Sequence, residues 1–216
     1  RESDGYRASS HSTYSAQYLA VEAPLHAELT LRLQVGRSTY RYQIPGPLTD
    51  AMFRANPRQS TRVRNYFSPD ITVPALRVEW RPSPATRLTA AFSGVLGVRN
   101  SVQFVGFATT PDTVDTSTGT YAPRQVDIDR FRSLTGEVRL THDYQLGPLR
   151  GLLAAGVAVS DNDLHRRQQG QGSTGTEYDV SLAAGDFGRD IHYRTRNLAG
   201  YLENVFRLTP RWSLIP

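Results

Sequence analysis

The connections between the apolar-alternating segments of this chain are alternately very short and very long, and this pattern constrains its fold most. About seven or eight such segments can be read from the alternation of apolar and polar residues. The short connections are 23–27, 82–87, 146–150 and 209–211. The long connections, each roughly thirty polar, Gly-, Pro- and Arg-rich residues, are 41–71, 100–130 and 162–191. Transmembrane β-barrels have this pattern because their strands turn tightly at one membrane surface and carry large loops at the other.

The alternation within the segments predicts strands with one face for lipid and one for water. In residues 28–40 the apolar set is Leu29, Leu31, Leu33 and Val35, and the opposite set is Thr30, Arg32, Gln34 and Gly36. The segments 72–81, 88–99, 131–144 and 193–208 repeat the pattern. Residues 151–161 are less decisive because their second face is mostly Ala and Gly. In residues 13–22 the outer set is either Tyr14 with Tyr18 or Leu19 with Val21.

Large aromatic residues lie close to the short connections. They are Trp80, Tyr144, Phe206 and Trp212, and each shares the parity of the apolar face of its strand. Membrane barrels carry such aromatic girdles at the lipid interface, which places the short turns at the periplasmic rim. A soluble antiparallel sandwich would use the same alternation for a core, but three such long loops are unusual in a compact sandwich. We therefore predict an all-β fold, an antiparallel segment of a transmembrane β-barrel.

The composition is compatible with this fold and excludes several others. The apolar content of 38% and mean hydropathy of −0.45 resemble those of a soluble protein, yet barrel strands expose only alternate residues to lipid. The absence of cysteine argues against a disulfide framework or a thiol nucleophile. All 25 cationic residues are arginine, which either reflects a GC-rich genome or serves bidentate binding of carboxylates. The arginines alternate with acids along the chain without a recognised motif, so nucleic acid is not an expected partner.

The two ends of the chain look like positions inside a longer protein. No apolar signal segment precedes Arg1, and residues 212–216 begin a new strand directly after a tight turn. We expect both ends to be cut.

No catalytic or metal-binding constellation can be recognised. The five histidines are scattered, and the acidic pairs at 127–129 and 161–163 do not continue into a calcium loop. The glycine-rich stretch 170–175 lacks the ending of a phosphate-binding loop and is predicted to be a mobile loop tip. Residues 49–57 predict a short helix, with Thr49 as its cap and Pro57 at its end. We expect neither enzymatic activity nor a bound metal ion.

The long loops concentrate arginine and glutamine, which together could form a basic mouth that draws in a polyanion. The candidate ligand-binding residues are Arg58, Arg62, Arg64, Arg99, Gln103, Arg124, Gln125, Arg166, Arg167 and Gln168. The alternative for any one of them is pairing with a neighbouring acid or with a lipopolysaccharide phosphate.

Several stretches resemble a known family. They are SDGYR at 3–7, IPGPLT at 44–49, NPRQ at 56–59 and YLENVFRLTPRW at 201–212. They resemble the barrel of TonB-dependent outer-membrane receptors, most closely the ferric-dicitrate branch. The resemblance implies a barrel of about 22 strands closed by an N-terminal plug, which imports a ferric chelate with energy from the TonB–ExbB–ExbD complex.

On this resemblance, residues 1–216 are part of the barrel domain, without the plug. The implied function is active transport of ferric citrate or a similar siderophore across the bacterial outer membrane, with no covalently bound cofactor. The implied partners are the chelate, outer-membrane lipid and lipopolysaccharide, and the TonB complex through the plug. The alternatives are a passive porin or small structural barrel, and a soluble β-sheet binding domain.

Overall fold

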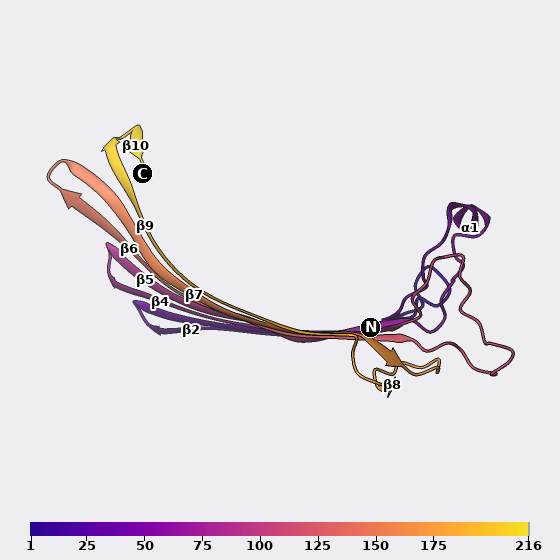
Figure 1. Ribbon diagram of the computed structural model, residues 1–216. Helices are drawn as coiled ribbons and strands as arrows, with labels where there is room; N and C mark the ends of the chain where they lie inside the picture. The colour runs from indigo at the N-terminus through magenta and orange to yellow at the C-terminus, as the bar shows by residue number, and fades with distance from the viewer. Residues whose placement is uncertain (216) are drawn as a thin grey trace.

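The computed structural model describes residues 1–215, and nearly all of its regular structure is one antiparallel sheet. The elements are β1 (Glu2–Ser3), β2 (Ser12–His26), β3 (Leu29–Gln43), α1 (Asp50–Ala55), β4 (Tyr66–Ser83), β5 (Thr86–Gln103), β6 (Gln125–Leu146), β7 (Leu149–Gly172), β8 (Leu182–Ala184), β9 (Arg189–Thr209) and β10 (Trp212–Leu214). The strand order is β1-β2-β3-β4-β5-β6-β7-β9-β10, and β8 pairs with β7. Figure 1 shows the sheet edge-on as a single curved layer. The predicted all-β fold is confirmed.

The two ends of the sheet differ as predicted. Tight turns join β2 to β3, β4 to β5, β6 to β7 and β9 to β10 at one end, which we call the turn end. Residues 44–65, 104–124 and 173–188 connect the strands at the other end, the loop end. There α1 and β8 lie on opposite sides of the sheet (Figure 1). No helix among residues 1–215 is both long and apolar enough to cross a membrane.

Strand register gives the sheet an apolar face and a polar face. On the apolar face Leu31 is opposite Val78, and Val138 is opposite Val157. On the polar face the neighbours of these residues along the strands are Arg and Glu, because successive side chains point to opposite sides of a strand. In β2, Leu19 is opposite Val35 and Val21 is opposite Leu33. This places Leu19 and Val21 on the apolar face, and it resolves the alternative that the sequence left open.

Several strands extend farther toward the loop end than predicted. β4, for example, begins at Tyr66 and not near residue 72. β6 begins at Gln125, and β7 continues to Gly172, so residues 162–167 pair with both β6 and β9. The apolar alternation ends near residue 161, but the backbone pairing does not. Gly170 and Gly172 are therefore buried in β7 and are not a loop tip.

Tight packing is confined to the loop end. Val102 and Val126, opposite each other on β5 and β6, are each 0% exposed, and Pro69 near the start of β4 is also fully buried. Along the rest of the apolar face large side chains are exposed, including Leu198 at 76% and Leu202 at 73%. The most completely buried side chains of the described residues therefore gather at the loop end of the sheet.

Candidate ligand-binding site at the loop end

Arg64 joins the three long loops. Its Nη2 donates to Asp112 Oδ1 at 2.7 Å and to the carbonyl oxygen of Ala122 at 2.8 Å. Its Nη1 is 3.5 Å from the carbonyl oxygen of Thr174, in the third loop. The side chains of Arg64 and Asp112 are 0% and 1% exposed. A buried charge is tolerated only when it is paired and hydrogen-bonded, and Arg64 meets that condition by contacts between loops.

Arg62 also connects two loops, in its case through hydrogen bonds to backbone carbonyl oxygens. Its guanidinium donates to the backbone of Gly106 at 3.0 Å, Phe107 at 2.9 Å and Thr110 at 3.1 Å. The guanidinium carbon also lies 4.9 Å from the centre of the Phe104 ring. With 1% of the residue exposed, Arg62 ties the first long loop to the second.

Arg124 ties the end of the second loop to the third. It donates to the carbonyl oxygens of Arg64 at 2.8 Å and Glu177 at 2.9 Å, and to Ser173 Oγ at 3.1 Å. Burial, together with the nearby positive charge of Arg64, lowers the pKa of the Arg124 guanidinium. The sequence predicts ligand contacts for three of these arginines, Arg62, Arg64 and Arg124. The structure places them inside the loop assembly, where their guanidinium N–H groups donate to protein atoms.

Another group of the candidate residues comes together on the polar face, just below the loops. Arg99 Nη2 donates to Asp129 Oδ2 at 2.6 Å, and Arg166 donates to both Asp129 oxygens at 3.0 Å. The Asp129 side chain is 5% exposed, whereas those of Arg99 and Arg166 are 46% and 30% exposed. One buried carboxylate therefore orients two arginines that remain accessible.

Three glutamines complete this group. Gln103 is opposite Gln125, on the side of β5 that carries Arg99. Gln168 is opposite Arg189 and lies two residues from Arg166, on the same side of β7. Arg99, Gln103, Gln125, Arg166 and Gln168 form what we call the polar-face patch. Gln125 Nε2 donates to both oxygens of Asp127 at 3.0 Å. The other members of the patch offer guanidinium and amide donors, the groups that bind carboxylates and other anions.

The last two candidates lie apart from the polar-face patch. Arg58 is exposed beyond α1, with its guanidinium carbon 5.1 Å from the centre of the Tyr6 ring. Arg167 points to the apolar face, since it is opposite Ile128, and its guanidinium carbon is 5.0 Å from the Phe187 ring centre.

An aromatic cluster beside the polar-face patch was missed by the sequence analysis. Tyr40 and Tyr42 lie on the polar face of β3, with ring centres 6.0 Å apart, and Tyr42 is 5.5 Å from Phe67. Tyr14 is 6.2 Å from Tyr40. Phe67 is opposite Ser101, which lies between Arg99 and Gln103 on β5. The sequence did carry a signal for this cluster. Tyr40 and Tyr42 are an even number of residues from Arg32, so they share the polar face of the strand with it.

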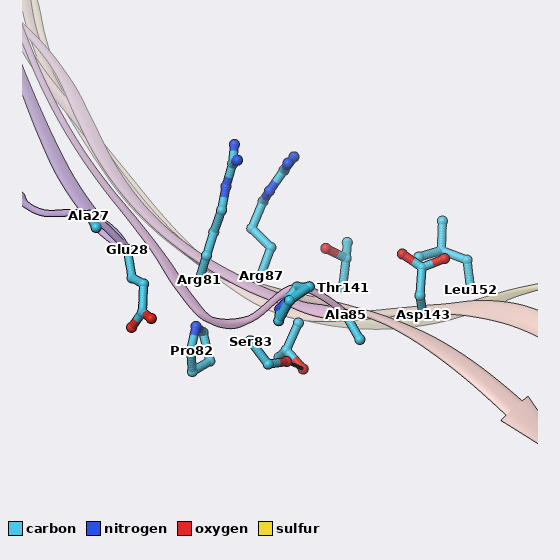
Figure 2. Close-up of a pocket in the computed structure, with 12 residues that line it drawn as sticks. Ala27, Glu28, Arg81, Pro82, Ser83, Ala85, Arg87, Thr141, Asp143 and Leu152 are labelled. Atoms are coloured by element: carbon cyan, nitrogen blue, oxygen red, sulfur yellow. Dashed lines mark hydrogen bonds between the residues drawn. The ribbon is translucent and has the colours of Figure 1, made fainter.

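A hollow also lies at the turn end, away from these residues. Figure 2 shows Arg81 and Arg87 extending to one side of the ribbon, with Glu28 and Pro82 on the other. Arg81 Nη2 is 2.6 Å from Glu79 Oε1 and Arg87 Nε is 3.5 Å from it. Among residues 1–215, no group of three or more His, Asp or Glu side chains is arranged to hold a metal ion.

Comparison with solved structures identifies the architecture. The ferric citrate transporter FecA in its unliganded form superposes with a TM-score of 0.78 over 97% of this chain, at 15% sequence identity. The chain has the fold of a TonB-dependent receptor barrel wall. The resemblance seen in the sequence is therefore confirmed at the level of the fold. The chain spans 29% of the length of FecA.

A second receptor has the same arrangement. The ferric-catecholate import receptor Fiu from E. coli K12 matches in its open and closed forms, each with a TM-score of 0.61 and 16% identity over 97% of this chain. The chain covers 37% and 34% of those two structures. No family model and no curated protein sequence matches the chain.

Proposed function

We propose that this chain is part of the barrel wall of a bacterial outer-membrane receptor that imports a ferric chelate. In this arrangement the apolar face contacts lipid and the polar face lines the lumen. The turn end is periplasmic and the loop end is outside the cell. The likeness of the fold to FecA and Fiu, whose names describe iron-chelate transport, supports this assignment.

The observation that carries the proposal is the Arg99–Asp129–Arg166 group. It lies on the polar face at the loop end, where a ligand entering from outside would meet the lumen wall. The group has two guanidiniums for one carboxylate, and both guanidiniums remain accessible. Asp127 on the same face is bound by the amide of Gln125. Arginine binds carboxylates in a bidentate manner, so the group suits an anionic chelate such as ferric citrate.

The buried arginines have a supporting role in this proposal. Arg62, Arg64 and Arg124 hold the loops around the entrance, and the polar-face patch together with Arg58 contacts the chelate. Transport itself requires a plug domain and the TonB–ExbB–ExbD complex, which we propose belong to the complete protein. Nothing covalent happens to the chelate, and the protein is neither an enzyme nor a carrier of a covalent cofactor.

The test is ferric-citrate binding by the full-length protein. The triple variant Arg99→Gln, Asp129→Asn, Arg166→Gln removes both cations without leaving a buried carboxylate unpaired. Its matched control is Arg54→Gln, which removes an exposed arginine at the last turn of α1. We expect the triple variant to bind ferric citrate at least about tenfold more weakly, which corresponds to about 1.4 kcal/mol, and the control to bind normally.

Two results would each contradict one part of the proposal, either the binding site or the identity of the chelate. Equal affinity of the triple variant and the unmodified protein would exclude the polar-face patch as the binding site. Failure of the unmodified protein to bind ferric citrate, with binding of a ferric catecholate instead, would retain iron-chelate import and exclude citrate.

A further inference from the structure

Two histidines face each other across β7 and β9, on the apolar side of the sheet but beyond its apolar residues. His165 is opposite His192, and the centres of the two imidazole rings are 5.4 Å apart. Leu198, opposite Val159, is the last apolar side chain on this face of β9 toward the loop end. His192 lies six residues beyond Leu198, which is roughly 20 Å along a strand. The pair is therefore clear of the surface proposed to contact lipid.

Each imidazole is held by an aspartate of the neighbouring strand. His165 Nε2 is 2.6 Å from Asp190 Oδ1, and His192 Nε2 is 2.9 Å from Asp163 Oδ1. A carboxylate only accepts hydrogen bonds, so Nε2 carries the proton in each ring. In a neutral imidazole the lone pair then belongs to Nδ1. Neither Nδ1 atom has a hydrogen-bond partner among residues 1–215.

The carboxylate–imidazole pairs have the arrangement that orients histidine ligands of metal ions. An imidazole that binds a metal ion usually donates its other N–H to a carboxylate, which fixes the tautomer and the ring orientation. Two imidazoles bound to one tetrahedral ion through nitrogens at about 2.1 Å would have ring centres about 5.2 Å apart. The observed separation of 5.4 Å is close to this value, so it fits a shared ion without movement of the strands.

The charges around the pair decide which cations it can hold. Arg130 of β6 is opposite His165, and Arg194 of β9 is opposite Asp163. These guanidiniums offset the charge of the aspartates, so a hard cation such as Ca²⁺, which depends on carboxylate oxygens, is not favoured. Imidazole nitrogen instead suits Zn²⁺, Ni²⁺ and Cu²⁺.

We infer that His165 and His192 together bind one divalent transition-metal ion of this class, with Asp163 and Asp190 orienting the two rings. Water completes the coordination, since no group of three or more His, Asp or Glu side chains among residues 1–215 is arranged to hold a metal ion. The imidazoles are 36% and 60% exposed, so the ion can enter from solvent. The sequence indicated no metal site because the two histidines lie on different strands. The site is on the face opposite the polar-face patch and does not depend on the ferric-chelate function.

The experiment is a calorimetric titration of the full-length receptor in detergent with Zn²⁺, and with Ca²⁺ as the comparison ion. One variant is His165→Gln with His192→Gln, and the other is Asp163→Asn with Asp190→Asn. The matched control is His26→Gln, which removes an exposed histidine at the end of β2. The urea unfolding midpoint of each variant in lipid vesicles without metal reports whether the fold is kept.

We expect the unmodified receptor and the His26→Gln control to bind an additional equivalent of Zn²⁺ that the double glutamine variant does not bind, with equal unfolding midpoints. The double asparagine variant should bind this Zn²⁺ about tenfold more weakly, because the carboxylates no longer orient the rings. Equal Zn²⁺ binding by the double glutamine variant, or displacement of the ion by an equal concentration of Ca²⁺, would overturn the inference.

A second measurement needs no variant. Bound Zn²⁺ joins β7 to β9, so it should slow hydrogen exchange of the backbone amides in residues 162–168 and 189–195 of the unmodified receptor. Unchanged exchange of these amides at saturating Zn²⁺ would also contradict the site.

Discussion

The guanidinium of Arg64 donates two hydrogen bonds to Asp112 Oδ1, from Nε at 2.9 Å and from Nη2 at 2.7 Å, although the two residues belong to different loops. The pair is inaccessible to solvent. Removing Arg64 leaves the Asp112 carboxylate buried without a counter-charge, whereas Arg64 without Asp112 still donates to the carbonyl oxygen of Ala122 at 2.8 Å. Removing both together leaves neither charge uncompensated. We therefore expect substitutions at this pair to change the free energy with which the loop 104–124 opens.

Arg64→Ala should lower the free energy of opening of the loop 104–124 by about 3 kcal/mol, because Asp112 is left as an uncompensated buried charge. Hydrogen exchange of the backbone amides in that loop measures the effect in the full-length protein. The matched control is Arg32→Ala, whose pair with Glu22 on the polar face is bidentate but half-exposed, and which should cost less than about 1 kcal/mol. The combined change Arg64→Met with Asp112→Leu should recover part of the loss. A loop that exchanges normally in Arg64→Ala would contradict the role assigned to this pair.

Gly97 in β5 lies where two strands approach closely. A Cβ atom added there would be 2.7 Å from the carbonyl oxygen of Asp70 and 2.9 Å from Cζ of Phe131. Since the first contact is with backbone, relief requires a shift of β4 relative to β5. Gly97→Ala should therefore reduce stability by about 1–3 kcal/mol.

The control for this substitution is Gly200→Ala in β9, where the nearest atom to the added Cβ is 3.9 Å away. Both variants can be compared by urea unfolding of the full-length protein in lipid vesicles. Similar unfolding midpoints for the two variants would show that the close approach at Gly97 is not a constraint.

The Thr49 side chain accepts a hydrogen bond from the Met52 amide at 3.2 Å and caps α1. Thr49→Ala should destabilise this helix by about 1 kcal/mol, and Thr49→Asn should be nearly neutral because asparagine also caps well. Faster hydrogen exchange at Phe53, whose amide bonds to the Thr49 carbonyl at 2.9 Å, would report the loss in the alanine variant alone. Equal exchange in the two variants would argue against the cap.

Trp80 lies near the turn end on the apolar face, opposite Leu88, and is 45% exposed. With this face in contact with lipid, the fluorescence of Trp80 should be quenched more strongly by lipids brominated near the headgroup than by lipids brominated at the chain ends. The measurement needs the full-length protein with its other tryptophans replaced. Quenching by aqueous iodide in place of brominated lipid would contradict the assignment of this face to the membrane.

Much of the fold could be predicted because the decisive signals are local. Alternation in a strand such as residues 28–40 needs only neighbouring residues to be read, and Thr49 and Pro57 mark a helix within one short segment. The extension of β7 to Gly172 could not be seen in the same way. Beyond residue 161 both faces of the strand are polar, so pairing with β6 and β9 continues without any apolar pattern.

The candidate site was only partly predictable for the same reason. The sequence alone determined most of the strands and their faces, the two kinds of connection and the concentration of arginine near the loops, but it left the faces of residues 13–22 open. Only the tertiary structure decided that Arg64 and Arg124 are buried in the loop assembly while Arg99 and Arg166 remain accessible beside Asp129. The burial of an arginine depends on carbonyl and carboxylate groups from loops that are distant in sequence, and no local pattern records which loops will converge on it.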